Sequence, residues 1–308
     1  MNYLITIIGP TAIGKTSLSI ALAKHFNCEI ISCDSRQFYK EMQIGTAVPS
    51  VEELESVQHH FIQNKSIFEH YSVGDFEKEA ITKLDELFLK NNIQIMVGGS
   101  GLYVDAVLKG FDEFPEIDSK LRDEVRKSYD KNGIQYLQKI LKVLDFEYFT
   151  TLSESNPQTL QNPQRMMRFV EVCIGTGKPY SSFLNLKKNQ RNFTPIVIGL
   201  DAERELIYNR INQRVDLMIK EGLLLEAEKL YPNKNLNALQ TVGYSELFDY
   251  LDNKISLEFA IEEIKKNTRR FSKRQLTWFK RIENAVWFDY ITDQKKIIEY
   301  LQLTIHNS

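Results

Sequence analysis

The sequence has few cysteines and no long apolar run. Its three cysteines, Cys28, Cys33 and Cys173, are odd in number and form no C-x-x-C pair. This argues against a disulfide framework and against a zinc site, and it fits a reducing cytosol. No apolar stretch approaches the roughly 18 residues that a membrane span needs. The first residues lack the basic region and cleavage site of a signal peptide. We therefore expect a cytoplasmic protein without a membrane anchor.

The sequence also lacks an excess of charge of either sign. The net charge is −2 and the isoelectric point is near 6.3, so no global positive field attracts nucleic acid. Any RNA contact must come from local basic patches. The 308 residues suffice for one large domain, or for one domain that carries a smaller one, and nothing demands more than a monomer. His59 and His60 are adjacent instead of one helical turn apart, so we expect them in a loop or in the core.

Strand-like and helix-like segments alternate in the N-terminal third of the chain. Apolar runs predict strands at residues 4–8, 29–32 and 93–97, and helical periodicity predicts helices at 15–26 and 76–90. This alternation predicts a parallel sheet that is covered by helices on both faces.

The middle of the chain follows a different pattern. From residue 116 to 190 the pattern is mostly helical and contains no convincing strand, with helix candidates at 121–133, 134–143 and 163–174. Residues 193–201 then return to the sheet, and the long helices that follow include 202–230 and 257–282. We therefore predict an all-helical insertion domain at 116–190 in an α/β core formed by 1–115 and 191–308.

A complete phosphate-binding loop follows the first predicted strand. It matches G-x-x-x-x-G-K-[ST] and consists of Gly9, Pro10, Thr11, Ala12, Ile13, Gly14, Lys15 and Thr16. Backbone N–H groups and the following helix N-terminus can bind phosphate oxygens, Lys15 can reach the outer phosphates, and the Thr16 hydroxyl can hold Mg²⁺. The pattern predicts a P-loop NTPase-like parallel sheet flanked by helices. The loop recognises a diphosphate without specifying its carrier, and ATP is the default.

Candidate catalytic residues follow two other strands. Asp34 comes after the strand at 29–32, and Ser100 comes after the strand at 93–97, where many P-loop proteins have a metal-binding aspartate. Because neighbouring parallel strands end at one edge of a sheet, both side chains should face the diphosphate. A carboxylate there can accept a proton from a nucleophile. Alternatively, Asp34 caps its turn and Ser100 is a small residue in a glycine-rich turn.

Basic residues form three further candidates. Arg210 and Arg214 lie one helical turn apart and can stabilise a leaving diphosphate. Residues 264–281 hold eight Lys or Arg and no acid, with aromatic residues between them. In the insertion, Arg165 and Arg168 share a helix face. The last two groups can neutralise RNA phosphates. The alternative for Arg210 and Arg214 is a solvated helix face, and the alternative for 264–281 is a solvated helix with an aromatic stripe packed on the core.

Several motifs in this order span nearly the whole chain. They are GPTAIGKT at 9–16, Asp34-Ser35 with Tyr39, MQIGTA at 42–47, GGSGLY at 98–103, NPQRMMR at 162–168, TGKP at 176–179, VGY at 242–244 and KRQLTWFKR at 273–281. Together they resemble the tRNA dimethylallyltransferase family, bacterial type. The resemblance implies transfer of a dimethylallyl group from dimethylallyl diphosphate to the exocyclic amino group (N6) of the adenosine 3′-adjacent to the anticodon of tRNAs, with release of pyrophosphate.

The resemblance also implies a role for each candidate. Residues 9–16 hold the diphosphate, Asp34 is the general base, Ser100 stands near the reacting carbon, and Lys15 and Arg214 contact the departing pyrophosphate. The tRNA anticodon stem-loop is the expected partner. Its contacts are Asp34, Ser35, Arg36, Gln37, Ser100, Arg122, Gln164, Arg165, Met166, Met167 and Arg168, to which the basic segment adds Lys273 and Arg274.

The sequence departs from the family pattern at a few positions. Ser100 replaces threonine and keeps the hydroxyl, Gln58 replaces proline, and Ser245-Glu246 replace Arg-Gln, which puts one basic RNA contact in doubt. No zinc finger is present in the C-terminal part, as expected for the bacterial type. The main alternative function is a P-loop nucleoside or nucleotide kinase. A prenyltransferase for free adenine nucleotides and a non-enzymatic RNA-binding ATPase are the others.

Overall fold

The computed structural model describes residues 1–184 and 190–307, and it divides into two compact units. Unit 1 comprises Met1–Lys109 and Arg191–Ser308, and unit 2 comprises Gly110–Gln190. The first boundary therefore lies at Gly110, earlier than residue 116, which we expected because Pro115 precedes the change of composition. The second boundary falls at the expected position.

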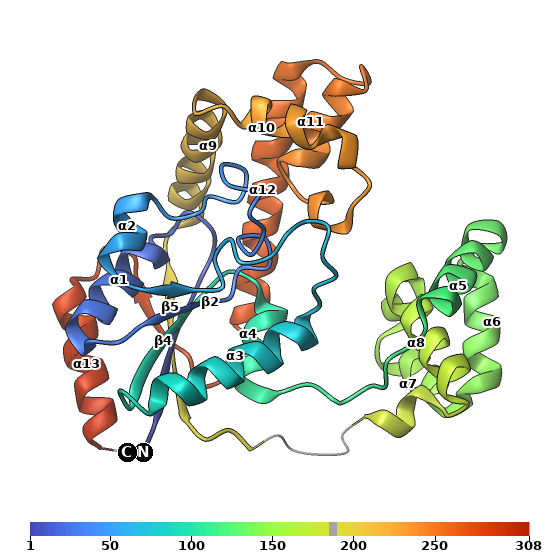
Figure 1. Cartoon of the computed structure of the whole chain (residues 1–308), viewed down its shortest axis with the longest axis horizontal. Helices are drawn as coiled ribbons and strands as arrows, with labels where there is room; N and C mark the ends of the chain where they lie inside the picture. The colour runs from blue at the N-terminus through green and yellow to red at the C-terminus, as the bar shows by residue number, and fades with distance from the viewer. Residues whose placement is uncertain (185–189, 308) are drawn as a thin grey trace. The chain divides into compact units, whose positions relative to one another are not determined.

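Unit 1 contains a parallel sheet (Figure 1). Among the described residues it has six strands in the order β3-β2-β4-β1-β5-β6, and each adjacent pair is parallel. The strands are Tyr3–Ile8 (β1), Ile30–Ser32 (β2), His59–His60 (β3), Ile93–Val97 (β4), Thr194–Asp201 (β5) and Val286–Asp289 (β6). The predicted fold class is confirmed. The sequence analysis missed β3 and β6, which are short edge strands.

Helices cover both faces of the sheet because its central strands are apolar on both sides. In β1, Ile5 and Ile7 pack with Leu22 of one helix layer, whereas Leu4 and Ile8 pack with Phe76 of the other. The first layer includes α1 (Lys15–Phe26), α9 (Arg204–Lys220) and α13 (Gln294–His306). The second layer includes α3 (Val73–Phe88), α4 (Gly101–Lys109) and the C-terminal end of α12 (Leu257–Phe279). Burial of each large apolar side chain stabilises the fold by about 1.5–3 kcal/mol.

A second cluster of helices in unit 1 packs around α12. It contains α10 (Leu223–Leu230) and α11 (Tyr244–Leu251), with Leu223, Tyr244 and Ile264 in its core. The single helix predicted at 202–230 is wrong. Gly222 adopts a φ of 103°, which ends α9 and starts α10 in a new direction. A left-handed backbone favours glycine, since any side chain there is strained.

Unit 2 is helical throughout the residues that the structure describes. Its helices are α5 (Ser119–Asn132), α6 (Ile134–Leu144), α7 (Phe146–Ser155) and α8 (Pro163–Thr176), with short 3₁₀ helices at Pro157–Gln161 and Tyr180–Phe183. Leu137, Leu141, Met166 and Val170 are fully buried in its core. The three predicted helices are present, and α7 was missed. Within the described parts of both units, no helix is long and apolar enough to cross a membrane.

Glu226 on α10 binds the loop that follows the second strand. Its carboxylate accepts hydrogen bonds from the backbone N–H groups of Gln43 (3.1 Å), Ile44 (2.9 Å) and Gly45 (2.9 Å) and from the Tyr244 hydroxyl (2.6 Å). Position 45 requires glycine, because a Cβ there would lie 2.5 Å from the Tyr244 ring. One carboxylate thus joins three segments of unit 1.

We predict that Glu226→Ala lowers the free energy of unfolding by about 1–3 kcal/mol, because it leaves several partly buried donors without an acceptor. The matched control is Glu228→Ala on the same helix, where the side chain is exposed. That variant should change stability by less than about 0.5 kcal/mol. Urea denaturation measures both values, and equal stability of the two variants would contradict the role given to Glu226.

Candidate active site

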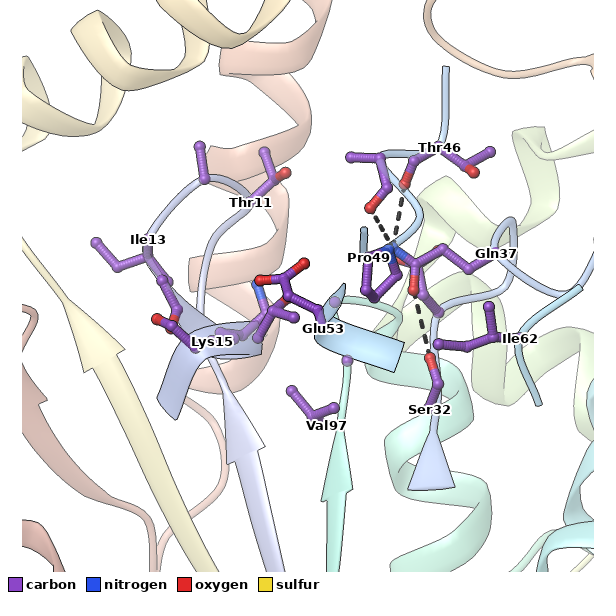
Figure 2. Close-up of a pocket in the computed structure, with 18 of the residues that line it drawn as sticks. Thr11, Ile13, Lys15, Ser32, Gln37, Thr46, Pro49, Glu53, Ile62 and Val97 are labelled. Atoms are coloured by element: carbon purple, nitrogen blue, oxygen red, sulfur yellow. Dashed lines mark hydrogen bonds between the residues drawn. The ribbon is translucent and has the colours of Figure 1, made fainter. Parts of the chain in front are cut away.

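Three loops meet at the carboxyl ends of β1, β2 and β4. They are the phosphate loop 9–16, the turn at Asp34 and the loop at Gly98–Gly101, and they enclose a pocket with α2 (Val51–Ser56). Figure 2 shows Lys15 on one side of this pocket and Gln37 on the other, with Glu53 and Val97 between them. The predicted site residues that line it are Thr11, Ala12, Ile13, Gly14, Lys15, Thr16, Asp34, Gln37 and Arg214.

The phosphate loop has the backbone that a phosphate cradle needs. Gly9, Ala12 and Gly14 have positive φ values of 146°, 64° and 108°, and Gly14 stands at the N-terminus of α1. A Cβ at Gly9 would lie 2.6 Å from the carbonyl oxygen of Leu200, so only glycine lets the loop approach β5 this closely. The curled backbone and the helix N-terminus together favour an anion.

Side chains from distant segments hold this loop in place. Arg210 Nε donates to the carbonyl oxygen of Ala12 (2.7 Å), and Arg214 Nη1 lies 3.5 Å from Thr11 Oγ1. Gln275 Oε1 accepts from the N–H of Thr11 (2.9 Å). The two arginines predicted on α9 therefore differ in role. Arg210 holds the phosphate loop, whereas Arg214 lines the pocket.

The charges in the pocket favour a bound anion. Lys15 Nζ donates to the carbonyl oxygen of Pro10 (2.8 Å), and burial lowers the pKa of Lys15 to about 8, with Asp34 raising it and Arg214 lowering it further. Burial and the neighbouring Arg210 lower the pKa of Arg214 as well. Two cations and two carboxylates, those of Asp34 and Glu53, thus line one pocket. The two cations lie beside the phosphate loop, where they can bind phosphate oxygens.

Asp34 and Ser100 lie close together, but they differ in their relation to the pocket. Asp34 lines it, and its Oδ1 accepts from the N–H of Arg36 (3.0 Å), so the carboxylate does cap its turn. Its Oδ2 accepts no hydrogen bond within the described residues. The Ser100 hydroxyl accepts from the Ser35 N–H (3.0 Å) and donates to the Ser35 hydroxyl (3.0 Å). Ser100 is next to Gly99, which lines the pocket, but it is outside the lining itself.

Arg36 and Gln37 have structural partners. Arg36 Nη1 donates to the carbonyl oxygens of Asn237 (3.1 Å) and Ala238 (3.0 Å), and Gln37 Nε2 donates to those of Thr46 (3.1 Å) and Ala47 (2.9 Å). These bonds hold neighbouring loops around the pocket. Any tRNA contact of either side chain must share or replace them.

Two titratable residues that line the pocket, Glu53 and His59, were not among the predicted site residues. Glu53 on α2 caps its own helix through the N–H of Ser50 (2.9 Å) and lines the pocket. His59 of β3 bonds through Nδ1 to the Val57 carbonyl oxygen (2.8 Å), and burial lowers the pKa of its ring. Its Nε2 is buried without a hydrogen-bond partner in the described structure. The acidic helix start at 50–53 was the available signal for Glu53. The adjacent pair of histidines was noted but was expected in a loop or in the core, whereas it forms the edge strand β3.

The donor set of the pocket fits Mg²⁺. The residues that line it include the Thr16 hydroxyl and the carboxylates of Asp34 and Glu53. Over the described ranges, no group of three or more His, Cys, Asp or Glu could hold a metal ion on its own. Mg²⁺ prefers oxygen ligands, keeps several waters and is usually held jointly by protein groups and substrate phosphates.

The basic segment at 264–281 is partly neutralised by acids from other elements. Lys265 pairs with Asp216 (2.8 Å) and Lys280 with Asp201 (3.0 Å). Lys273 and Arg274 are exposed and take part in no ion pair within the described residues. Arg274 lies over the Phe271 ring at 5.7 Å. The unpaired positive surface of α12 is therefore smaller than the composition suggests, and it includes these two predicted residues and the exposed Arg270.

The predicted RNA-binding residues of unit 2 divide by exposure. Gln164 and Arg165 are exposed, Met167 and Arg168 are half-buried, and Met166 is completely buried. The predicted tRNA contact of the Met166 side chain does not fit the structure, because that side chain fills the core of unit 2.

Two half-buried arginines remain beside the exposed pair. The Arg168 guanidinium lies 5.6 Å from the Phe114 ring, and Arg122 lies close enough to lower its pKa further after burial has lowered it. The Nε of Arg122 is buried without a hydrogen-bond partner among the described atoms. Both arginines act electrostatically on Glu171, a single acid.

The departure at Ser245-Glu246 has a structural explanation. Glu246 is buried, and its carboxylate accepts from the N–H of Gly243 (2.8 Å) and from Asn267 Nδ2 (2.7 Å). It therefore joins the start of α11 to α12. Ser245 donates to the carbonyl oxygen of Thr241 (3.1 Å). Both side chains therefore form hydrogen bonds within unit 1, at the positions where the family pattern has Arg-Gln.

This geometry defines a P-loop-like α/β protein, and within the described residues the loop that follows β4 carries no carboxylate into the pocket. A family model described as IPP transferase matches residues 37–282. The chain is 75% identical to a tRNA dimethylallyltransferase of Flavobacterium psychrophilum, over 98% of each chain. It is 73% identical to one of Flavobacterium johnsoniae, over 100% of each. The chain belongs to the tRNA dimethylallyltransferase family, as its motifs indicated.

Solved structures agree with this assignment. The full-length tRNA isopentenylpyrophosphate transferase of Bacillus halodurans aligns with a TM-score of 0.72 at 37% identity, over 99% of this chain and 96% of the other. A eukaryotic dimethylallyltransferase acting on tRNA aligns with a TM-score of 0.82 at 27% identity, over 100% of this chain and 80% of the other. Family membership makes the chain a prenyltransferase and decides against the kinase alternative.

We predict that the affinity for inorganic pyrophosphate falls as the pH rises through about 8, the pKa of Lys15 in the free protein. Below that pH the ammonium is charged and attracts the anion, whereas above it the neutral amine does not. Lys15→Arg is the control, since a guanidinium stays charged throughout this range and the ligand's own titration is the same. Calorimetric titration on both sides of this pH gives the comparison. Identical pH profiles for both proteins would contradict the assignment.

Proposed function

We propose that the pocket binds the diphosphate of dimethylallyl diphosphate and that the chain transfers the dimethylallyl group to N6 of the adenosine 3′-adjacent to the anticodon of tRNA. The observation that carries this proposal is the meeting of the phosphate loop, Lys15, Arg214 and Asp34 in one pocket. The family assignment supplies the class of reaction, and the pocket supplies groups for its two halves, departure of pyrophosphate and activation of an amine.

Departure of pyrophosphate requires stabilisation of negative charge on the oxygen that leaves carbon. The amides of the phosphate loop, the Lys15 ammonium and the Arg214 guanidinium are already fixed before substrate binds. Such preorganised donors stabilise developing charge without reorganisation during the reaction. Lys15 and Arg214 therefore act on the leaving group.

Activation of the amine falls to Asp34. One oxygen of its carboxylate holds the turn, and Oδ2 is left to accept a proton from N6 as the carbon–nitrogen bond forms. Ser100, fixed by Ser35, stands beside this carboxylate and can orient the amine or the reacting carbon. The adenine must leave the stack of the anticodon loop to reach them.

Mg²⁺ is the expected cofactor. Thr16 would hold it, with the carboxylate of Glu53 as a further oxygen ligand or an acceptor for its waters. When bound, the ion neutralises charge on the diphosphate. The chain's own residues orient the two substrates.

For the tRNA, we propose that Lys273 and Arg274 of α12 and Gln164, Arg165 and Arg168 of unit 2 supply contacts to the anticodon stem-loop. The exposed cations suit phosphates, which fix the position of the RNA. We further propose that the protein works as a monomer in the cytoplasm.

Mass analysis tests the reaction. Purified protein is incubated with tRNA, Mg²⁺ and either dimethylallyl diphosphate or ATP, and the RNA is digested and weighed. We expect one adenosine beside the anticodon to gain the mass of one dimethylallyl group with the first donor and no change with ATP. An unchanged tRNA with both donors, or a phosphorylated product with ATP, would exclude the proposed function.

Asp34→Asn separates the two roles of Asp34. Asparagine can still accept from the Arg36 N–H, so the turn survives, but it cannot act as a base. We predict a fall in turnover of roughly 10²–10⁴-fold, with unchanged pyrophosphate affinity. The control is Asp293→Asn, a capping aspartate that accepts from the N–H of Lys295 in α13. Turnover of Asp34→Asn within a few-fold of the control would reduce Asp34 to a turn cap.

The salt dependence of tRNA affinity tests whether the exposed cations of α12 bind RNA. Replacing Lys273 and Arg274 with alanine should weaken tRNA binding and make the log–log salt dependence shallower by roughly 0.7–0.9 per lost phosphate contact. The control replaces Lys295 and Lys296, two exposed cations of α13, so the net charge changes equally. If both double variants shift the slope alike, the effect is general electrostatics and α12 is no specific surface.

A further inference from the structure

Gln275 is a buried polar residue that holds the phosphate loop and has no part in the proposed chemistry. It lies on α12 and is 6% exposed. Its Oε1 accepts from the Thr11 N–H (2.9 Å), and its Nε2 donates to the Gly99 carbonyl oxygen (2.9 Å). The orientation of the amide follows from its partners, because a backbone N–H only donates and a carbonyl only accepts. Both polar ends of the side chain are therefore used.

Two glycines of the loop at Gly98–Gly101 lie in close contact with side chains of α12. A Cβ at Gly99 would lie 2.4 Å from Gln275 Nε2, and a Cβ at Gly101 would lie 2.4 Å from the Trp278 ring. Trp278 Nε1 donates to Asp105 Oδ2 (2.7 Å), which fixes the ring. One turn of α12 thus packs directly on the backbone on either side of Ser100.

Gln275 joins the phosphate loop 9–16 to the loop at Gly98–Gly101. Each of these loops also has other support. The phosphate loop is also held at Ala12 by Arg210. The loop at Gly98–Gly101 is also held through the Ser35–Ser100 hydrogen bonds. What Gln275 alone provides, among the hydrogen bonds of the described residues, is a direct link between Thr11 and Gly99.

We propose that Gln275 is a positioning residue that sets the separation of the diphosphate loop from the Asp34–Ser100 side of the pocket. This inference rests on the proposed function. In that reaction the first carbon of the dimethylallyl group moves in line from the diphosphate oxygen to N6, so the distance between the two loops sets the alignment. Small errors in such an alignment reduce the rate far more than the binding of either substrate. Lys273 and Arg274 lie on the exposed face of the same helical turn, so α12 connects the proposed RNA surface to this link.

Two substitutions distinguish the two hydrogen bonds. Gln275→Met has a similar length and removes both. Gln275→Glu keeps the acceptor for the Thr11 N–H, but as a carboxylate it cannot donate to the Gly99 carbonyl oxygen. When protonated, the same glutamic acid can do both. Thr277→Ala is the control, because Thr277 is exposed on the same helix and its hydroxyl bonds only within the helix.

The measurement is the kcat for prenyl transfer to tRNA, together with the affinities for inorganic pyrophosphate and for tRNA. For Gln275→Met we expect kcat to fall by roughly 10²-fold, with both affinities within a few-fold of the wild type. For Gln275→Glu we expect the ratio of its kcat to that of the wild type to rise as the pH falls. The ratio removes the pH dependence that the two proteins share. Thr277→Ala should match the wild type.

The proposal is overturned if Gln275→Met keeps a kcat within a few-fold of the wild type. It is equally overturned if kcat and pyrophosphate affinity fall together, since that marks general damage to the loop. If Gln275→Met does not fold, Gln275→Glu decides: a kcat ratio independent of pH rejects the proposal. A wild-type protein that transfers no prenyl group rejects the proposed function itself.

Discussion

A phosphate loop must keep its backbone N–H groups unpaired for the ligand, so it cannot be stabilised by a regular ladder of its own. In this protein the support comes from segments about 200 or more residues further along the chain. Arg210 binds the Ala12 carbonyl oxygen, and Gln275 binds the Thr11 N–H. The helices α9 and α12 therefore support the phosphate loop in addition to packing their apolar faces on the sheet. Both helices also carry cations that are proposed to bind the substrates.

The same arrangement explains the charge of the pocket. Lys15 and Arg214 are held close together and partly desolvated, and burial lowers the pKa of both. Two like charges in such a place are unfavourable until an anion arrives. In the proposed reaction, the diphosphate reduces this repulsion when it binds, and the same cations stabilise the departing pyrophosphate. Asp34, at the end of the strand next to β4, is the acid that the proposal assigns to the amine.

The parts of the fold and site encoded by local sequence were predictable. Continuous apolar runs identified β1 and β4, and the phosphate loop is a contiguous motif. The edge strand His59–His60 is too short and too polar to give a signal. The partners of the basic segment, such as Asp216 and Asp201, lie far from it in sequence, so its partial neutralisation could not be predicted. Met166 was predictable, because it shares a helical stripe with Phe169, Val170 and Cys173, and the motif drew attention away from that periodicity.

The central claim is that the phosphate loop holds the diphosphate of a prenyl donor in line with Asp34. A crystal structure with Mg²⁺ and a dimethylallyl diphosphate analogue that cannot release its leaving group tests it most directly. We expect the diphosphate on the amides of residues 12–16 with Lys15 and Arg214 as partners, and the first carbon on the side of Asp34 and Ser100. A diphosphate bound elsewhere, or a prenyl chain directed away from Asp34, would contradict the account.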